Sequence, residues 1–455
     1  MNHIDVVVVG AGISGIGAAY NLKTRCPQKS FTILEGRSNI GGTWDLFKYP
    51  GIRSDSDMHT MGFKFKPWRS PKTIADAPSI LSYLNETVDE NDLRKKIQFN
   101  KKVIAATWSS IDALWNLKVE DQTDNSIEET TCNFLYLCGG YYNYDEGYTP
   151  EFKNVEAFEG QVIHPQKWPE DLDYTNKEVI VIGSGATAVT IVPSMAEKVK
   201  HITMLQRSPT YYFAAPDEDK IGNFIKKLTS DRLGYFLVRW KNILMQRVML
   251  NRLRKHPEKT KEMLINHVRE HLGEDYDVDK HFTPRYMPWD QRLCFVPNGD
   301  MFQAMNSGKA TVVTDTINEF TSKGIKLDSG EELEADIIIT ATGLNMRLLN
   351  GIDIKIDNET LDISQKTQYK TMMFSDVPNL IATFGYTTAS WTLGADLISE
   401  YACKLINLLD KKDCDYFCPE TGDDVLAETD YLDLNSGYIE SCLLYTSPSP
   451  RDVEE

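Results

Sequence analysis

The sequence predicts an α/β fold in which one strand–turn–helix unit occurs twice. Three observations support this prediction: short apolar runs that suit parallel strands buried on both faces, helical patterns between several of these runs, and a glycine-rich turn directly after two of them. The clearest runs are Val6–Val9, Phe31–Leu34, Phe134–Leu137, Val179–Ile182, Ile202–Leu205 and Ile337–Ile339. The chain has 455 residues, 41% of them hydrophobic, which is enough for two or three domains.

The first glycine-rich turn comes directly after the first apolar run. It consists of Gly10-Ala11-Gly12-Ile13-Ser14-Gly15 and leads into a helical pattern over Ile16–Leu22. Gly10 permits a tight turn, Gly12 lets the backbone approach a pyrophosphate, and Gly15 lets the helix pack on the strand. The helix N-terminus offers amide donors to phosphates. The next run leads to Glu35, whose carboxylate can accept hydrogen bonds from ribose hydroxyls, so the unit predicts a dinucleotide site.

The segment after this unit indicates that the dinucleotide is FAD. A second glycine pair opens the run Gly41-Gly42-Thr43-Trp44-Asp45, and Tyr49–Asp55 comes soon after. The flavin ring of FAD lies far from its adenine and needs walls of its own. A glycine pair and then an aromatic residue at this place in the chain are suited to supply them.

The second unit has the same order of features with one difference at its end. The turn is Gly183-Ser184-Gly185-Ala186-Thr187-Ala188, and the next strand ends in Gln206-Arg207 instead of an acid. An acid would repel a 2′-phosphate, whereas Arg207 can bind it, so this unit should prefer NADPH to NADH. Together the units predict two Rossmann-like dinucleotide-binding domains, one for FAD and one for NADP. No cysteine near the FAD motifs is paired in sequence, which leaves oxygen as the electron acceptor.

Composition excludes several other classes of protein. The net charge is −17, and an acidic chain repels the phosphates of nucleic acid. No apolar run reaches membrane-spanning length, and no secretory leader precedes the first strand, so we expect a cytoplasmic location. The eight cysteines are scattered and lack accompanying histidines, which favours reduced thiols and predicts no metal site.

The stretch from about residue 220 to 285 is helical in pattern and unusually basic. Between Lys226 and Lys261 eleven Lys or Arg stand against two acids, and Phe224, Tyr235, Phe236 and Trp240 lie among them. One interpretation is a solvated helical insertion whose aromatic residues face the core. The other is a patch that makes peripheral contact with an anionic membrane.

A longer motif stands between the two glycine-rich units. Phe158, Gly160, His164 and Trp168, with Pro169 directly after them, match the FxGxxxHxxxW pattern, and on it the chain resembles Baeyer–Villiger monooxygenases. The resemblance implies that NADPH reduces FAD and that oxygen adds to form a C4a-(hydro)peroxyflavin. One oxygen atom then enters a ketone, giving an ester or lactone, or a sulfide or thioamide. The alternatives are an N- or S-oxygenating flavin-containing monooxygenase and an inactive truncated flavoprotein.

The resemblance also implies roles for individual residues. Arg292 would stabilise the reacting peroxide, Asp55 would hold Arg292, and His164 and Trp168 would couple domain closure to NADP binding. The implied FAD contacts are Ser14, Glu35, Thr43, Trp44, Asp45, Leu46, Asp55 and Val103, in addition to the glycines of the first turn. The implied NADP contacts are Arg53, Ser54, Asp55, Gly183, Ser184, Gly185, Ala186, Thr187, Ala188, Val189, Gln206 and Arg207.

These motifs divide the chain into segments. We expect residues 1–147 to form the first part of the FAD domain and residues 148–329 the NADP domain, with the helical insertion at about 220–285. Residues 330–440 should complete the FAD domain. Residues 441–455 have no helical or strand periodicity and resemble translated sequencing adapter, which favours a disordered, non-native tail.

Overall fold

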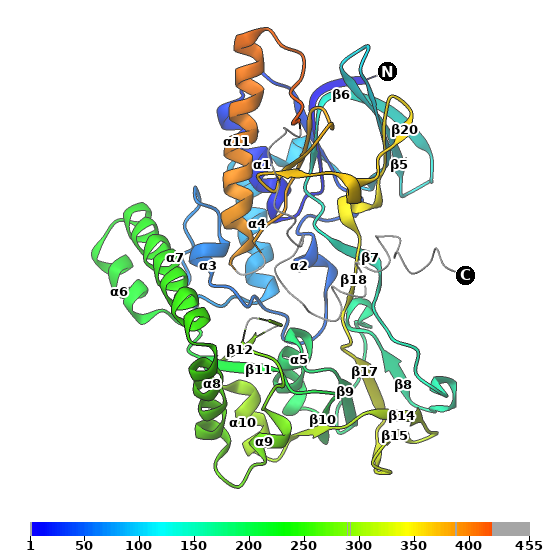
Figure 1. Cartoon of the computed structure of the whole chain (residues 1–455), viewed down its shortest axis with the longest axis vertical. Coiled ribbons are helices and arrows are strands. Elements are labelled where there is room, and N and C mark those ends of the chain that lie inside the picture. The colour runs from blue at the N-terminus through cyan, green and yellow to red at the C-terminus, as the bar shows by residue number, and fades with distance from the viewer. Residues whose placement is uncertain (1, 289, 292, 387–388, 421–455) are drawn as a thin grey trace.

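The computed structural model describes residues 2–288, 290–291, 293–386 and 389–420. Two sheets with helices packed against them stand one above the other, and two paired strands run between them (Figure 1). All six apolar runs named above form strands of these sheets, which confirms the predicted α/β class. The tail 441–455 lies outside the described residues.

The first sheet has nine strands and contains the first glycine-rich unit. Its order is β20-β19-β4-β5-β6-β1-β2-β3, with β23 also paired to β6. Helices α1, α4 and α11 and a buried apolar core lie on one side, and a second core lies on the other. The elements are β1 (Asn2–Val9), α1 (Ile13–Arg25), β2 (Phe31–Leu34), α4 (Ala77–Glu90), β3 (Ile97–Gln98), β4 (Lys101–Ser109), β5 (Leu114–Asp121), β6 (Ile127–Leu137), β19 (Asp353–Ile356), β20 (Glu359–Thr360), β23 (Leu380–Ala382) and α11 (Trp391–Lys412).

The second sheet is parallel throughout and contains the second unit. Its order is β13-β10-β9-β17-β8, and its strands are β8 (Gln161–Ile163), β9 (Glu178–Ile182), β10 (His201–Gln206), β13 (Ala310–Thr314) and β17 (Ile337–Thr340). Helices α5 (Ala186–Ala196) and α10 (Asp300–Asn306) pack against it. Because β17 pairs with β8 and β9, the chain stays in this sheet through Thr340, beyond the boundary expected at residue 330.

Smaller elements complete the two halves. In the second half they are the ribbon β11 (Tyr211–Ala215) with β12 (Leu293–Pro297), and the sheet β14 (Ile317–Phe320), β15 (Gly324–Leu327) and β16 (Glu332–Glu334). In the first half they are the short helices α2 (Thr43–Leu46) and α3 (Met58–Met61) and the pair β21 (Gln368–Tyr369) with β22 (Met373–Phe374).

The chain crosses between the two sheets twice, and the crossings pair with each other. Strand β7 (Tyr142–Gly147) comes after the first sheet and precedes the second, and β18 (Leu344–Met346) comes after β17 on the way back. The two strands are antiparallel, and they run side by side between the two halves in Figure 1. Ala341-Thr342-Gly343 lies between β17 and β18, on the second crossing.

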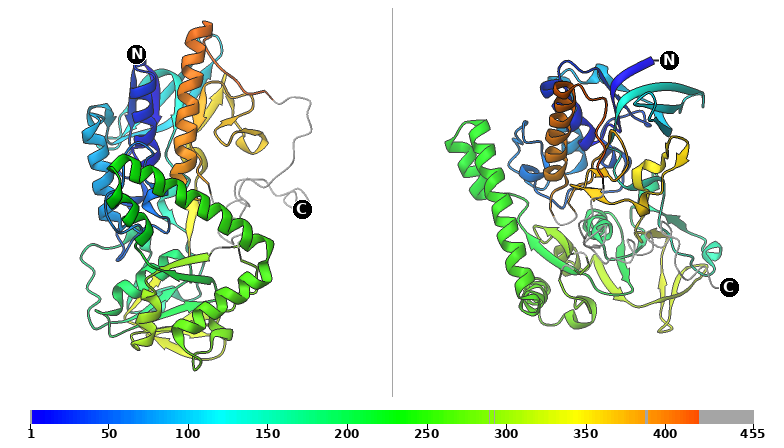
Figure 2. Two further views of the ribbon diagram at one scale, coloured as in Figure 1. Left: turned by 90° about the vertical axis from the view of Figure 1, so that its left-hand side faces the viewer. Right: turned by 45° about the horizontal axis from the view of Figure 1, so that its top comes forward.

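The first part of the helical insertion packs against the first domain, and its second part packs against the second domain. It comprises α6 (Lys220–Leu228), α7 (Asp231–Lys255), α8 (Pro257–Leu272) and α9 (Val278–His281). Figure 2 shows the long helix α7 lying across the outside of the molecule. Arg239 on α7 is buried; its Nη1 donates to the carbonyls of His59, Thr60 and Gly62, and its Nη2 pairs with Asp396 on α11 at 2.9 Å.

Three of the four aromatic residues named in the insertion do not face the core, contrary to the interpretation of a solvated helical insertion. Tyr235 is buried and donates to the Phe63 carbonyl, but Phe224 is 62% exposed, Phe236 53% and Trp240 49%. The physical reason is that polar side chains of α7 make its contacts with the first domain. Arg239, Asn242 and Gln246 bond to α3, to α11 and to Asp57, so its apolar residues are left on the outer face. In the described part of the chain no helix is both long and apolar enough to cross a membrane.

We predict that Arg239→Met destabilises the protein. Asp396 would remain buried without its partner, and burial already raises the pKa of this carboxyl to about 6, against the pull of Arg239. Removing one member of a buried pair typically costs about 3–5 kcal/mol. Urea unfolding should show this loss, whereas Arg247→Met, which removes an exposed cation of the same helix, should change stability by less than about 0.5 kcal/mol. Equal effects of the two changes would contradict the pairing argument.

Candidate active site

The first glycine-rich turn brings α1 against the end of β1. Gly10 has φ +99°, a conformation that side chains disfavour, and a Cβ on Gly15 would lie 1.9 Å from the Gly10 carbonyl oxygen. Gly12 is the N-cap of α1, and no side chain caps the helix, so its first amide groups remain available to an anion. A Cβ on Gly12 would meet only Gly42, at 3.6 Å, which leaves the face for phosphate approach open. The arrangement fits the predicted pyrophosphate cradle.

Glu35 comes directly after β2 and lies against the same turn. Its Oε2 accepts from the Ala11 amide at 2.6 Å, and its Oε1 accepts from the Arg37 amide at 2.9 Å. Burial raises the pKa of this carboxyl, and the two amide bonds oppose the rise. Each carboxylate oxygen keeps a further lone pair, so the group is positioned and able to accept a ribose hydroxyl.

The second glycine pair covers the first turn. The Gly41 amide donates to the Ala11 carbonyl at 3.0 Å, and a Cβ on Gly42 would lie 3.2 Å from the Gly12 Cα. The α2 turn then places Asp45 in a buried ion pair with Arg37, with 2.8 Å between Nη2 and Oδ2. Thr43 contacts Tyr144 at 3.4 Å, while Trp44, Leu46 and Val103 pack against apolar clusters of this domain. Glu35 and the second glycine pair thus lie against the first turn, while Trp44, Leu46 and Val103 belong to apolar clusters of the same domain.

An aromatic group beside this turn was missing from the predicted site. Trp391 begins α11 and donates from Nε1 to the Ser14 Oγ at 2.7 Å. Its ring lies 5.4 Å from that of Tyr141 and 5.5 Å from that of Phe384. A local sequence pattern could not place these residues beside Ser14, because they come from the start of the first crossing and from the end of the domain.

The second glycine-rich turn repeats the backbone of the first. Gly183 has φ +127°, and a Cβ there would lie 2.3 Å from the Ala341 carbonyl oxygen. The N-cap Gly185 of α5 has φ −81° and ψ −173°, against −76° and −172° at Gly12, and no side chain caps either helix. A Cβ on Gly185 would meet nothing within 4 Å, so this turn also has an open face. Ser184 Oγ contacts Thr210 Oγ1 at 2.9 Å, Ala186 begins α5, and Ala188 and Val189 are buried below it.

Gln206 and Arg207 at the end of β10 differ in exposure. Gln206 is buried, and its Nε2 donates to the His281 carbonyl at 2.7 Å and to Thr314 Oγ1 at 2.8 Å. Its amide therefore holds α9 against β13, a packing role that the sequence pattern did not indicate. Arg207 is exposed, and among the described residues no hydrogen bond or ion pair holds its guanidinium. It remains available to bind a phosphate.

The loop after the FAD motif packs directly on the NADP motif. Gly51 has φ +75°, and a Cβ there would lie 1.7 Å from the Ser194 Oγ on α5. Tyr49 hydrogen-bonds to Thr187, and burial raises the pKa of this phenol to about 12. Arg53 forms an ion pair with Asp300 of α10. These three contacts hold the loop that follows the FAD motif against α5 and α10 of the second domain.

The other two predicted residues of this loop lie in different environments. Ser54 is buried, and its Oγ donates to the Ser56 carbonyl at 2.8 Å. Asp55 is exposed on the same loop. Ser54 therefore stabilises the loop, whereas Asp55 has a carboxylate at its surface.

The fingerprint histidine lies at the paired crossings. His164 Nε2 is 3.2 Å from the Gly343 carbonyl oxygen, and Nδ1 accepts from the Gln166 amide at 3.2 Å. Burial lowers the pKa of this imidazole, which favours a neutral ring that donates from Nε2 to the carbonyl. A Cβ on Gly147 would lie 1.9 Å from the ring, so the imidazole fits only because β7 ends in glycine. Trp168 packs against the core of the second domain.

Arg292 lies outside the described residues, as does Trp289. Asp290 and Met287 form a tight turn through two hydrogen bonds of 3.1 Å. Cys294 on β12 has its Sγ 3.8 Å from the Ser184 carbonyl oxygen. Cys294 is therefore next to the predicted NADP loop.

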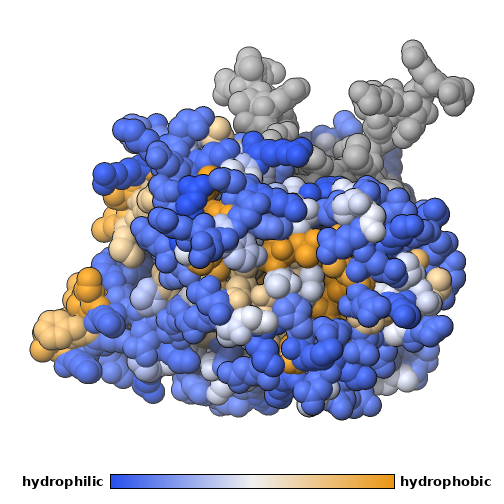
Figure 3. Space-filling view, turned by 90° about the horizontal axis from the view of Figure 1, so that it is seen from below, coloured by the Kyte–Doolittle hydropathy of each residue, from blue (hydrophilic) through white to orange (hydrophobic). Residues whose placement is uncertain are grey.

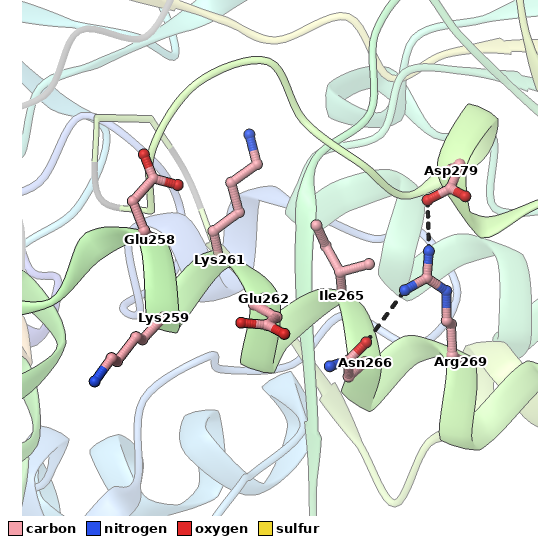
Figure 4. A pocket seen from close by; sticks show the side chains of 8 residues that line it. All are labelled: Glu258, Lys259, Lys261, Glu262, Ile265, Asn266, Arg269 and Asp279. Atoms are coloured by element: carbon pink, nitrogen blue, oxygen red, sulfur yellow. Dashed lines mark hydrogen bonds and ion pairs between the residues drawn. The ribbon is translucent and has the colours of Figure 1, made fainter.

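A separate pocket of about 420 Å³ lies on α8, away from both glycine-rich turns. Figure 4 shows its charged lining, with Arg269 bonded to Asp279 at 2.5 Å and to Asn266 at 3.1 Å. None of the predicted site residues lines it. Its charged side chains are paired or face water, so we do not assign it to the reaction.

The fold and the two dinucleotide units agree with the comparisons to known proteins. Residues 4–373 match the flavin-binding monooxygenase-like family, and the chain belongs to this family. It is 52% identical over 437 residues to the FAD-containing monooxygenase EthA of Mycolicibacterium smegmatis, covering 96% of this chain and 88% of the relative. It is 49% identical to a probable FAD-binding monooxygenase, AlmA, of Acinetobacter baylyi, with coverage of 96% and 88%.

Solved structures of similar fold come from monooxygenases. A steroid monooxygenase bound to NADP superposes with a TM-score of 0.77 at 22% identity, covering 91% of this chain and 87% of that one. An open form of cyclohexanone monooxygenase gives 0.77 at 21% identity, with coverage of 91% and 89%. At this identity the likeness concerns the fold.

We predict that Gly12→Ala lowers FAD binding without unfolding the apoprotein. The added methyl group meets only Gly42 at van der Waals distance, but it occupies the open face of the turn. Flavin absorbance per protein should fall, while the melting temperature of the apoprotein stays close to that of the wild type. Gly15→Ala is the matched control and should lower both, because its methyl group collides with the Gly10 carbonyl. Unchanged flavin content in Gly12→Ala would contradict the cradle.

Proposed function

We propose that this enzyme uses NADPH and O2 to insert one oxygen atom into a ketone, giving an ester or lactone, and that it also oxygenates sulfides or thioamides. The observation that supports this most directly is the joint geometry of the two glycine-rich turns and the fingerprint. The Tyr49–Asp55 loop, which follows the FAD motif in the chain, packs on the helix that begins at the second turn. His164 of the fingerprint lies at the crossings between the domains. The solved proteins of similar fold include a steroid monooxygenase and a cyclohexanone monooxygenase, which agrees with this proposal.

The chain's own residues would bind and orient the two cofactors. The first turn and Glu35 would hold FAD, and Trp391 would keep Ser14 in place beside it. The second turn would hold the NADP pyrophosphate at the N-terminus of α5, and Arg207 would bind the 2′-phosphate. When bound, FAD would accept a hydride from NADPH and activate O2.

Arg292 is proposed as the catalytic cation. A guanidinium fixed in a water-poor cleft stabilises negative charge on the oxygen that attacks the carbonyl group and on the resulting adduct. Asp55, exposed on the loop between the two units, would orient this guanidinium. His164 and Trp168 would act through domain closure, since they contact the crossing and the second core.

Arg207→Ala should separate the two nicotinamide cofactors. One charge-assisted bond to the 2′-phosphate is worth about 1.5–3 kcal/mol, so kcat/KM for NADPH should fall by roughly tenfold to a hundredfold. NADH lacks this phosphate, and its kinetics should change little. Steady-state oxidation of both cofactors measures the difference. Equal losses for NADPH and NADH would overturn the role of Arg207.

Arg292→Ala should separate oxygenation from reduction. Losing a donor to developing negative charge costs about 3–4 kcal/mol in the charged step. NADPH oxidation should therefore remain measurable, while ester formation from a test ketone nearly vanishes and hydrogen peroxide rises. Arg292→Lys should recover little, because an ammonium lacks the planar fork. Ketone conversion at wild-type coupling would show that another group performs this role.

Product analysis and NADPH oxidation by the wild-type enzyme distinguish the alternative functions. Wild-type enzyme should convert one ketone and one sulfide to products one oxygen heavier. Conversion of the sulfide alone would favour an N- or S-oxygenase. A colourless protein that does not oxidise NADPH would indicate an inactive truncated flavoprotein.

We also propose that this is a cytoplasmic enzyme that makes peripheral contact with anionic membranes through its helical insertion. Lys227, Arg232, Arg252, Lys255 and Lys259 are exposed there, in a chain whose net charge is −17. A basic region attracts anionic lipid, while the acidic remainder of the chain is repelled, so the contact would have one orientation.

Binding to vesicles should depend on charge and salt. The enzyme should co-sediment with vesicles containing phosphatidylglycerol in preference to pure phosphatidylcholine. Raising the salt from about 0.1 M to about 1 M shortens the screening length from roughly 10 to 3 Å and should weaken this binding. Arg252→Gln/Lys255→Gln/Lys259→Gln should weaken it as well, and the matched control Lys95→Gln/Lys118→Gln/Lys412→Gln on the first domain should not. Lipid-independent sedimentation would contradict the proposal.

A further inference from the structure

The outer face of the insertion has a continuous apolar stripe. On α7 it consists of Leu233, Leu237, Trp240, Leu244 and Val248, spaced three or four residues apart and 41–65% exposed. This spacing keeps them on one side of the helix. On α6, Ile221, Phe224 and Leu228 are exposed with the same spacing. Figure 3 shows apolar side chains gathered at the left edge of the molecule, the side on which α6 and α7 stand in Figure 1.

The polar and apolar faces of α7 are placed in the reverse of the way found in an ordinary amphipathic surface helix. The face of α7 that contacts the first domain uses Arg239, Asn242 and Gln246 in hydrogen bonds, and the face away from the protein is apolar. A water-facing helix normally has the opposite pattern. Large contiguous apolar patches on a protein surface usually mark an interaction site.

Exposed cations lie at both ends of the α7 stripe. Lys227 and Arg232 lie where α6 and α7 join, and Arg247, Arg252 and Lys255 lie toward the end of α7, all exposed. Aromatic and aliphatic side chains bordered by Lys and Arg are typical of helices that lie in the headgroup region of a membrane. This pattern matches the chemistry of an anionic phospholipid. The acyl chains would contact the apolar stripe, and the phosphates would contact the cations.

We propose that the α6–α7 hairpin inserts its apolar stripe into the boundary between headgroups and acyl chains of an anionic bilayer. This inference rests on the membrane contact proposed above and adds that the contact is hydrophobic insertion, beyond charge attraction at the surface. A second copy of the chain fits this face less well, because pairing two such hairpins would bring their cationic borders together.

The experiment uses the full-length holoenzyme and vesicles of phosphatidylcholine with phosphatidylglycerol. In the first arm, Leu237→Ser/Trp240→Ser is compared with Ile111→Ser, which removes an apolar side chain that is 96% exposed on the first domain. The hairpin variant should lose about tenfold or more in partitioning to vesicles, since it no longer buries these side chains in lipid. The control should partition as the wild type does. Flavin content and NADPH oxidation should stay unchanged in both.

The second arm tests directly how deeply Trp240 enters the bilayer. Lipids brominated on the acyl chain quench tryptophan that enters the hydrocarbon boundary, and the chain has eight tryptophans. Quenching should occur in the wild type and be strongly reduced in Trp240→Phe, which keeps an aromatic side chain at the stripe.

The outcomes separate this inference from the proposals on which it rests. If only the Arg252, Lys255 and Lys259 changes reduce binding, and acyl-chain quenching is absent, surface contact stands and insertion is overturned. If no vesicle composition binds the wild type, both membrane proposals fail, while NADPH oxidation still reports on the enzyme. If the wild type forms a dimer that Leu237→Ser/Trp240→Ser dissociates, and vesicles are not bound, the stripe pairs with a second copy and the inference is wrong.

Discussion

The contact of His164 with the two crossing strands is the constraint on which the arrangement of this enzyme depends. The imidazole occupies the space above Gly147 at the end of β7, and its Nε2 faces the Gly343 carbonyl just before β18. One ring therefore touches the outgoing and the returning connection between the domains. Burial lowers the pKa of the imidazole, and the contact is a hydrogen bond to a carbonyl, which needs no charge partner. Both connections of the chain between the two sheets run through this pair of strands, so a change in domain orientation would change the backbone here.

The two nucleotide turns have the same backbone conformation because the same steric constraints act on both. In each, a glycine with positive φ lies against a carbonyl from a neighbouring strand end, at Cys138 for Gly10 and at Ala341 for Gly183. In each, the helix begins at a glycine whose side is open. The two units differ in the side chain at the end of their second strand. Glu35 is locked onto the first turn by the Ala11 amide, whereas Arg207 extends past the end of β10. A fixed acid suits ribose hydroxyls, and a free guanidinium suits a phosphate.

The insertion shows where pattern alone gives the wrong orientation. Its sequence alternates apolar and basic residues, and apolar side chains are buried in most helices, so the first interpretation placed its aromatic residues in the core. The structure buries Arg239 instead, because a guanidinium can bond to three carbonyls at the end of α3 and to Asp396 at once. The position of those acceptors depends on α3 and α11, which lie far from α7 in the sequence. The apolar face was therefore left outside.

The sequence by itself determined the α/β class, the two glycine-rich turns and the acid or base after each second strand, because these features rest on local backbone geometry and on residues close together in the chain. The fingerprint could likewise be recognised from spacing. Only the tertiary structure decided which groups meet across long separations. Trp391 bonds to Ser14, Tyr49 to Thr187, and Gln206 turns inward to hold α9. It also decided that the chain leaves the second sheet after Thr340, since strand pairing depends on β8 and β9 and not on the composition near residue 330. Such contacts arise from packing among distant segments, which no local pattern encodes.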